Sequence, residues 1–265
     1  MLIHWNRVFA FRFQGGARMP QHVRSKWKKT AALMGSGSLK RLIPETVRFG
    51  RRTLSGKLKR YGMVYVKPES GTHGRGVMKA ELAEGGSCRL SSGSRQRAYP
   101  SCGAMAKALR RKIGSRRYLI QRGIRLLKYK GRVFDLRVMA QLTPRRRWRT
   151  TGMIGRVAAP RKIVTNYHNG GKLVPVGRLL GRNMGKSSAD RTIRELEGIG
   201  VKAGRTLRRR YPGVCEVGVD IGLDRSFKPW IIEVNTRPDP YIFRKLPDPS
   251  IFKRIRRYER AYGRK

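Results

Sequence analysis

The chain has 265 residues, of which 63 are lysine or arginine and only 15 are aspartate or glutamate, so its formal net charge is +48 at pH 7. A hydrophobic fraction of 39%, gathered in several apolar runs, excludes disorder throughout, and the length suits one large domain or two small ones. No run reaches the roughly 18 apolar residues of a membrane helix, so we expect no membrane span. The charge predicts salt-sensitive attraction to polyanions, including non-specific binding to nucleic acid, but no zinc finger, RNP motif or basic zipper accompanies it.

The N-terminal segment and the cysteines allow predictions about the cellular compartment of the protein. Residues 1–22 form a basic N-terminal segment for which we predict irregular structure. Two arginines interrupt its apolar part, so we predict no signal peptide and expect synthesis in the cytoplasm. Cys88, Cys102 and Cys215 are odd in number and show no CxxC spacing. We therefore expect neither a disulfide framework nor a zinc site, and we expect a reducing compartment.

The first half of the chain predicts short helices and strands. Ser25 is suited to cap a helix that runs to Leu33, and the segment from Met63 to Lys67 predicts a strand that Pro68 closes. A tight glycine loop separates this strand from a returning strand, so the two form a hairpin. The loop covers 71–76, the returning strand 77–82, and a helix at 101–113 and a strand at 118–121 follow.

The second half predicts longer elements. The best helix pattern begins at Asp190 and ends at Tyr211, before Pro212. Strands and helices alternate without strict βαβ regularity, which indicates α+β subdomains. We predict strands at 133–142, 150–159, 214–223 and 229–234, and a basic helix at 250–262.

Carboxylates are concentrated near the last two strands, where a chain this basic would otherwise have few. Asp220, Glu233 and Asn235 offer only oxygen ligands, which Mg²⁺ prefers, and Glu233 and Asn235 share one face of a strand. The alternative is a surface hairpin whose acids offset nearby lysines and arginines. Five of the 15 acids fall within this stretch: Glu216, Asp220, Asp224, Glu233 and Asp239.

Lys67 stands at the end of a strand, a few residues before the glycine loop. A lysine in this place would put its ammonium on nucleotide phosphates, and the loop would close its backbone N–H groups over them. The loop is neither a Walker A motif nor the dinucleotide fingerprint. Taken alone, the loop is more often a plain hairpin turn, and Lys67 is one of 63 basic residues.

Asp135 and Arg137 alternate on a predicted strand and therefore face the same side, with Arg156 on the next strand. Two arginines that point into one cleft would suit a transferring phosphoryl group, whose oxygens accept bidentate hydrogen bonds. The alternative for Asp135 is ordinary salt bridging between strands.

In their order along the chain, these pieces resemble the ATP-grasp superfamily. The glutathione-synthetase and ribosomal-protein glutamate-ligase branch is similar in Asp135-Leu-Arg137, Asn166-Tyr-His-Asn-Gly-Gly171 and Glu233-Val-Asn235. The strongest resemblance, over roughly residues 23 to 260, is to the YheC/YheD family, which comprises endospore coat-associated proteins of Gram-positive spore formers. Its signatures are similar to Ser25-Lys-Trp27, Leu42-Ile-Pro-Glu-Thr46, Val66-Lys-Pro68, Gly74-Arg-Gly76 and Tyr118-Leu-Ile-Gln-Arg-Gly-Ile124.

The resemblance implies an α+β protein with the ATP-grasp fold, in which two α+β subdomains clasp ATP. The α/β domain that usually precedes them is expected to be reduced or absent, because too few residues precede the Pro44-Glu-Thr46 segment. The implied ATP-grasp domain covers 23–260, with a glycine-loop subdomain at about 63–120 and a C-terminal metal-binding subdomain at about 121–260.

The resemblance also assigns roles to residues. Lys67 would contact the α- and β-phosphates, Lys26 would be a second nucleotide lysine, and Arg137 and Arg156 would be the catalytic groups on the transferred phosphoryl group or the substrate carboxylate. Asn166 would also lie in the nucleotide site. The flexible lid over the phosphates would comprise Gly71, Thr72, His73, Gly74, Arg75 and Gly76. The hinge whose backbone reads adenine would comprise Gln121, Arg122, Gly123 and Ile124. One or two Mg²⁺ (or Mn²⁺) ions would be held by Asp220, Glu233 and Asn235.

The implied reaction makes an acyl phosphate from a carboxylate and ATP, for attack by an amine or thiol, while the metals neutralise charge on the leaving phosphate. Neither the carboxylate nor the amine is specified, and the high positive charge suggests a polyanionic polymer as acceptor. Two alternatives stay open: a non-catalytic ATP-binding structural protein of the spore or its coat, and a basic polyanion-binding protein. Spore association follows from the resemblance alone.

Overall fold

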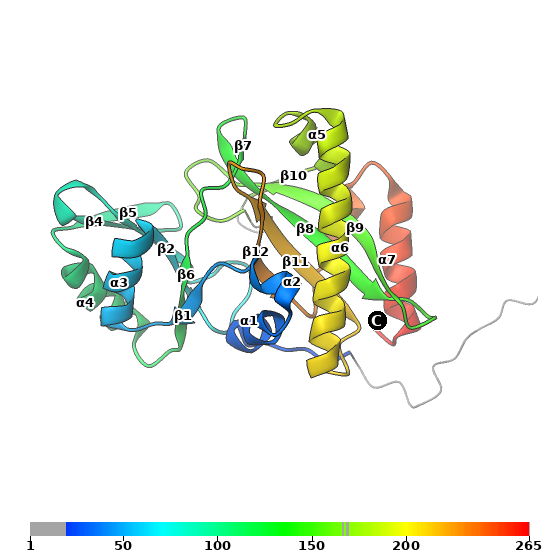
Figure 1. The fold of residues 1–265 in the computed structure, drawn as a ribbon, viewed down its shortest axis with the longest axis horizontal. Helices are drawn as coiled ribbons and strands as arrows, with labels where there is room; N and C mark the ends of the chain where they lie inside the picture. Colours follow the sequence, from blue (N-terminus) through cyan, green and yellow to red (C-terminus); the bar gives the residue numbers. More distant parts are fainter. Residues whose placement is uncertain (1–19, 166, 168–169, 265) are drawn as a thin grey trace, which may run out of the picture.

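The computed structural model describes residues 20–165, 167 and 170–264, so most of the basic segment at 1–22 lies outside the described residues. Within the described part, the strands form two antiparallel sheets of six strands each. Figure 1 shows the smaller unit at the left and the larger at the right. This combination of helices with antiparallel sheets confirms the predicted α+β class.

The first sheet has the strand order β1-β6-β2-β3-β4-β5. The predicted hairpin on either side of the glycine loop is present, because β2 and β3 pair antiparallel. Two helices, α3 (Arg51–Tyr61) and α4 (Cys102–Ile113), bury leucines and a methionine in one apolar cluster with the sheet. The strands are β1 (Thr46–Arg48), β2 (Met63–Pro68), β3 (Met78–Leu82), β4 (Cys88–Ser92), β5 (Arg95–Tyr99) and β6 (Tyr118–Arg122).

The second sheet has the order β10-β9-β8-β11-β12, with β7 paired to β8. One face packs on α6 (Lys186–Arg210), and the other packs on α7 (Pro249–Ala261). Neighbouring residues of β8 show this alternation, since Val138 belongs to the first cluster and Met139 to the second. The strands are β7 (Lys128–Tyr129), β8 (Arg132–Leu142), β9 (Trp148–Val157), β10 (Lys172–Val174), β11 (Glu216–Leu223) and β12 (Pro229–Asn235).

The long helix α6 begins four residues before the predicted start at Asp190, after Gly185 as its N-cap. Asp190 is exposed and does not cap the helix, whereas the preceding Ala189 is already buried against α5 (Val176–Gly181) and the sheet. Packing of the first turn therefore makes the helix begin earlier than the sequence pattern predicts. Gly204 allows close approach farther along, because a Cβ there would lie 2.3 Å from the Trp148 ring.

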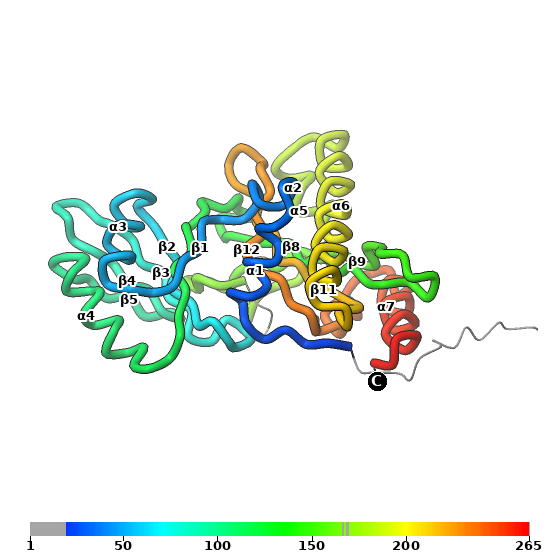
Figure 2. Tube along the Cα trace, turned by 60° about the horizontal axis from the view of Figure 1, so that its bottom comes forward, coloured from blue at the N-terminus to red at the C-terminus, as the bar shows by residue number. Residues whose placement is uncertain are grey.

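The N-terminal helices α1 (Lys26–Met34) and α2 (Gly37–Lys40) lie beside α6, between it and the first sheet (Figure 2). Ser25 caps α1 as predicted, since its Oγ accepts from the backbone N–H of Lys28 at 3.1 Å. The same hydroxyl donates to Glu69 Oε1 at 2.6 Å, and the backbone N–H of Lys26 donates to the Glu69 carbonyl at 2.8 Å. Since Glu69 directly follows β2, these bonds fix the start of α1 next to the glycine loop.

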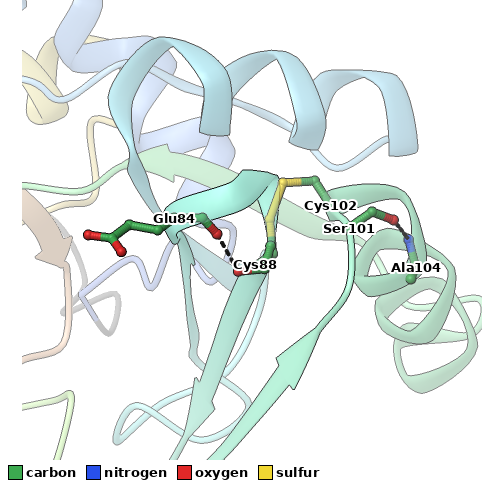
Figure 3. The surroundings of a disulfide bond; sticks show 6 residues. Glu84, Cys88, Ser101, Cys102 and Ala104 are labelled. Atoms are coloured by element: carbon green, nitrogen blue, oxygen red, sulfur yellow. Dashed lines mark hydrogen bonds between the residues drawn. A yellow bond between two sulfur atoms is a disulfide. The ribbon is translucent and has the colours of Figure 1, made fainter.

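Cys88 and Cys102 form a disulfide that joins β4 to the start of α4, so the expectation of no disulfide is wrong (Figure 3). The two residues are 14 apart in sequence and have no CxxC spacing. They meet because β5 pairs back along β4, which sets Cys88 opposite Tyr99, and α4 begins shortly afterwards at its Ser101 cap. The cysteines therefore do not support the expected reducing compartment.

None of the helices in the described part of the chain combines the length and hydrophobicity that a membrane span needs.

Candidate active site

A cleft lies where the first sheet faces β8, β11 and β12 of the second. Its inner part has a volume of about 120 Å³ and is lined by Lys67 and Tyr65 of β2 and by the segment that follows β6. Part of its lining is aliphatic, which suits a flat heterocycle. The apolar lining residues are Pro44, Val77, Ile124, Leu126, Val133, Ile163, Val164 and Ile232.

The predicted hinge, Gln121 to Ile124, runs along this inner part, and all but Gly123 line it. The N–H groups of Arg122 and Gly123 donate to the carbonyls of Glu45 and Met63, at 2.8 and 3.0 Å. Gly123 also has no space for a side chain, since a Cβ would lie 2.6 Å from Met63 Cε. A base in the cleft would therefore use the remaining backbone groups of this segment.

The glycine loop covers the outer part of the cleft, whose volume is about 330 Å³. Gly71, Thr72, His73, Gly74 and Arg75 line it, whereas Gly76 does not. Lys26 binds this loop, because its Nζ donates to the Gly71 carbonyl at 2.8 Å. The loop is thus tied to α1 at one end and to β3 at the other.

Gly76 has a different role from the rest of the loop. Its φ of 75° lies in the left-handed region, and a Cβ there would lie 2.9 Å from the Tyr118 hydroxyl. Gly76 therefore shapes the turn into β3, and its neighbours provide the cleft surface.

Three lysines gather around Glu233. Lys26, Lys29 and Lys67 are 8%, 4% and 6% exposed. Lys26 Nζ lies 3.5 Å from Glu233 Oε1, and Lys67 Nζ donates to the Ile232 carbonyl at 3.3 Å. Burial lowers the pKa of Lys67 and of Lys29 to about 8, although Glu233 and Asp220 act in the opposite direction. Lys29 was not among the predicted site residues, and its spacing of three from Lys26 on α1 is the signal that would have found it.

We expect the Lys29→Met variant to be more stable than the wild type at pH 7, by on the order of 1 to 3 kcal/mol, because it removes a buried ammonium. The pKa of Lys29 is about 8 in the native protein and 10.5 in the unfolded chain. The unfolded state therefore binds more protons in this window, and wild-type stability rises as pH increases from about 8 to 10.5. Urea unfolding at several pH values checks this: the advantage of the variant narrows across the window.

Lys28→Met is the matched control, because the neighbouring Lys28 is exposed. It should change stability by less than about 0.5 kcal/mol at every pH. An advantage for Lys29→Met that stays constant up to the highest pH would contradict the titration of Lys29.

Two arginines and two aspartates form a buried network on β8, β9 and β11. Strand pairing sets Asp135 opposite Arg156 and Arg137 opposite Asp220. Arg156 donates to both oxygens of Asp135, at 2.8 and 2.7 Å, and its Nη2 lies 2.9 Å from Asp220 Oδ2. Arg137 donates to both oxygens of Asp220, and Thr165 donates to Asp135 at 2.7 Å. Asp135 is thus a salt-bridge partner, which is the simpler of the two interpretations of the sequence.

The charges of this network are fixed by their partners. Burial alone would raise the pKa of Asp220, but Arg137 and Arg156 lower it to about 2. Burial alone would lower the pKa of Arg156, but Asp135 and Asp220 raise it. Both arginines line the outer part of the cleft together with Asp220. The network can therefore offer guanidinium N–H donors to a bound anion without changing its own protonation.

Asp220, Glu233 and Asn235 all line the outer part of the cleft, and Asp220 is paired with Glu233 across β11 and β12. A carboxylate has about four acceptor positions, of which Arg137 and Arg156 use three on Asp220, so about one remains. In the described part of the chain, no group of three His, Cys, Asp or Glu residues is close enough to hold a metal alone. Two carboxylates and one amide still fit Mg²⁺, which usually binds one or two carboxylates and completes its shell with phosphates and water.

The other acids of the carboxylate-rich stretch serve different purposes. Glu216 is fully buried and accepts from Tyr262 and Arg264, away from the cleft. Asp224 accepts from Trp230 Nε1 and from the backbone of its own turn. Asp239 lines the outer cleft and accepts from the N–H of Tyr241 at 2.9 Å. The predicted Asn166 lies outside the described residues, although Tyr167 beside it lines the cleft.

Comparison with known proteins agrees with this architecture. The family model described as YheC/D-like ATP-grasp matches residues 19–265. The endospore coat-associated protein YheD of Bacillus subtilis (strain 168) is 25% identical over 190 residues, which is 69% of this chain and 41% of that protein. The match therefore spans less than half the length of this relative.

A solved structure shows the same fold. The N5-carboxyaminoimidazole synthase of Aspergillus clavatus, in complex with ADP and 5-aminoimidazole ribonucleotide, aligns with a TM-score of 0.50 and 12% identity. The alignment covers 82% of this chain and 45% of that chain, and at this identity it bears on the fold alone. The family model covers most of the chain and shows that the chain belongs to the YheC/D-like ATP-grasp family.

Proposed function

We propose that this protein is an ATP- and Mg²⁺-dependent ligase that converts a carboxylate to an acyl phosphate, which an amine or thiol then attacks. The observation that carries the proposal is the charge balance of the cleft. Five buried cations stand there against two buried carboxylates and one half-buried carboxylate. The cations are Lys26, Lys29, Lys67, Arg137 and Arg156, and the acids are Asp135, Asp220 and Glu233.

An excess of buried positive charge is costly unless an anion offsets it. A nucleotide triphosphate supplies that anion, and its base would occupy the aliphatic inner part of the cleft. Lys67 and Lys26 would bind its phosphates, with the glycine loop closed over them. The division into a glycine-loop subdomain at about 63–120 and a metal-binding subdomain at about 121–260 remains part of this proposal.

Arg137 and Arg156 would act on the group in transfer. Their guanidinium groups are held rigid by Asp135 and Asp220, so they provide donors that need no reorganisation when charge develops on a phosphoryl group. Glu233, Asn235 and the remaining acceptor position of Asp220 would hold Mg²⁺, which neutralises charge on the phosphates when bound. Lys26 contacts both Glu233 and the glycine loop, and would therefore link loop closure to the metal ligands.

A non-catalytic role is the second candidate, and the relative in Bacillus subtilis favours it. That protein is described as endospore coat-associated, and a coat protein needs no turnover. In this role the chain would bind ATP as a structural ligand, in association with the spore. The acceptor of the ligase, in turn, would be an acidic compound or polymer, in keeping with the net charge of +48.

We expect ATP with Mg²⁺ to raise the melting temperature of the wild type and not that of the Glu233→Gln variant, because the variant loses a charged metal ligand. At a nucleotide concentration of about 100 Kd the stabilisation is about 2.7 kcal/mol. The measurement is a thermal-shift titration at salt high enough to screen the surface charge. Glu195→Gln is the control, because Glu195 is exposed on α6.

Equal shifts in the wild type and in Glu233→Gln, or a shift that needs no metal, would contradict the metal site. Release of ADP then separates the two candidates. A ligase forms ADP when a suitable acid is added and continues to turn over when the amine is present as well. Single amino acids and acidic peptides form the panel. A structural protein binds ATP and releases no ADP with any member of the panel.

A further inference from the structure

The mouth of the cleft carries two arginines that form no ion pair with a carboxylate of the described residues. Arg75 of the glycine loop and Arg237 after β12 both line the outer cleft. Arg137 and Arg156, deeper in the cleft, are bound by aspartates, and Lys26 is near Glu233. Among the residues that the structure describes, Arg75 and Arg237 are not within ion-pair distance of any carboxylate. Their donors therefore remain available to a ligand.

The backbone on both sides of Arg237 is fixed. Thr236 is 1% exposed and its Oγ1 accepts from the N–H of Val23 at 2.8 Å. The carbonyl of Pro238 accepts from Arg264 Nη2 at 2.8 Å, and the ring of Pro238 is buried against Gly218. Arg237 is thus an exposed side chain on a rigid support, which reduces the entropy lost when it binds a ligand.

His22 belongs to the same group. It directly precedes Val23, whose N–H is bound to Thr236, so the chain holds it beside Arg237 at the mouth of the cleft. Burial, Lys29, Arg24 and Arg237 all lower the pKa of His22 from 6.5, which places it in a strongly positive field. Asp239, two residues after Arg237, lines the same part of the cleft and accepts from the N–H of Tyr241 at 2.9 Å.

We propose that Arg237, Arg75 and His22 form an anion subsite for the acid substrate, which therefore carries at least two negatively charged groups. One carboxylate would lie near Arg137 and Arg156 and be activated, and a second anionic group would bind at the mouth. Arginine suits this purpose, since its planar donors match a carboxylate with two parallel hydrogen bonds. This inference rests on the proposed function, because it names the substrate class of that site.

The test is direct binding by titration calorimetry, with the tripeptide tri-L-glutamate as probe and tri-L-glutamine as its neutral counterpart. Both are titrated into protein loaded with Mg²⁺ and a non-hydrolysable ATP analogue, so that phosphate sites are already filled. We expect tri-L-glutamate to bind and tri-L-glutamine not to bind. Arg237→Gln should weaken tri-L-glutamate binding by about tenfold, which is about 1.4 kcal/mol. Arg225→Gln is the matched control, since Arg225 is exposed in the turn between β11 and β12 and does not line the cleft.

Four results would overturn the proposed subsite. It is overturned if tri-L-glutamate does not bind the wild type, if both peptides bind equally, or if Arg237→Gln and Arg225→Gln bind the probe equally well. Loss of probe binding when the ATP analogue is added would assign these cations to the nucleotide and also overturn it. Failure of the proposed function gives a different result, in which the analogue itself does not bind. In that case the titration into free protein still tests the subsite.

Discussion

Replacement of Asp220 by alanine is expected to lower the free energy of unfolding by about 3 to 5 kcal/mol. Asp220 accepts from Arg137 and Arg156, which are 6% and 4% exposed, so its removal leaves positive charge buried without a full complement of acceptors. Urea unfolding at neutral pH measures the loss. The exposed Asp190 gives the control, and Asp190→Ala should change stability by less than about 0.5 kcal/mol.

The pH dependence of Asp220 provides a second measurement. Its pKa is about 2 in the native protein and 3.8 in the unfolded chain, so the unfolded state binds more protons between these values. The stabilisation is fully present above this window and is lost as pH falls through it. The difference between the wild type and Asp220→Ala should therefore narrow as pH is lowered from about 4 to 2. A difference that does not narrow, or a loss below about 1 kcal/mol at neutral pH, would show that the network does not depend on Asp220.

If Asp220→Ala does not fold, Asp220→Asn keeps the shape and one acceptor oxygen and should lose less stability. A double variant, Asp220→Leu with Arg137→Met, should recover part of the loss, since it replaces a buried pair by apolar groups. Recovery would separate the burial of unpaired charge from simple loss of packing.

Replacement of Lys67 by methionine is expected to change two measurements in opposite directions. Lys67 is 6% exposed, and burial lowers its pKa to about 8. Removal of its ammonium should therefore stabilise the nucleotide-free protein by on the order of 1 to 3 kcal/mol at pH 7. The same change removes a charged donor from the phosphate site, and affinity for ATP with Mg²⁺ should fall by about 100-fold, or roughly 2.7 kcal/mol. Urea unfolding without nucleotide and a nucleotide titration measure the two effects.

Lys59→Met on α3 is the control for both, because Lys59 is exposed and does not line the cleft. Wild-type stability without nucleotide should also rise between about pH 8 and 10.5, where the unfolded chain holds a proton on this lysine and the native protein does not. A Met variant that binds the nucleotide as well as the wild type would remove Lys67 from the phosphate site. A variant that is less stable without nucleotide would show that Lys67 is a net stabilising group.

Asp220 and Lys67 line the same cleft but have opposite expected effects on stability. Asp220 stabilises the protein because its arginine partners are present in the structure. Lys67 and Lys29 are expected to destabilise it until an anion binds, and the proposed nucleotide would supply that anion. The unpaired lysines that would bind the ligand therefore lower the free energy of unfolding, whereas the paired network beside them raises it. This combination is common for binding sites.

Much of the site followed from the sequence because it lies on strands with strong patterns. The apolar runs of β2, β8, β11 and β12 predicted strands close to those observed. The alternation of a strand then placed Asp135 with Arg137, and Glu233 with Asn235, on common faces. Strand pairing in the structure sets Asp220 opposite both Arg137 and Glu233, so the predicted metal and phosphoryl residues lie together.

Other helices and strands show no clear pattern in their own sequence that would predict them. In α3 only two buried leucines, Leu54 and Leu58, face the sheet, and Gly56 interrupts the helix pattern. In β5 the residues are exposed and do not alternate, so the strand exists because it pairs with β4. The disulfide from Cys88 to Cys102 depends on that pairing, which is why cysteine spacing gave the wrong expectation.

The sequence by itself determined which residue types carry the chemistry and on which strand faces they lie, because strand periodicity is local. Only the tertiary structure decided which groups share the cleft. Lys29 and Glu233 are close in space but about 200 residues apart in sequence, and so are His22 and Arg237. Their proximity depends on the packing of α1 against β12 and on the bond from Val23 to Thr236. No local pattern encodes such contacts, since they arise from burial of surfaces that the two ends of the chain provide together.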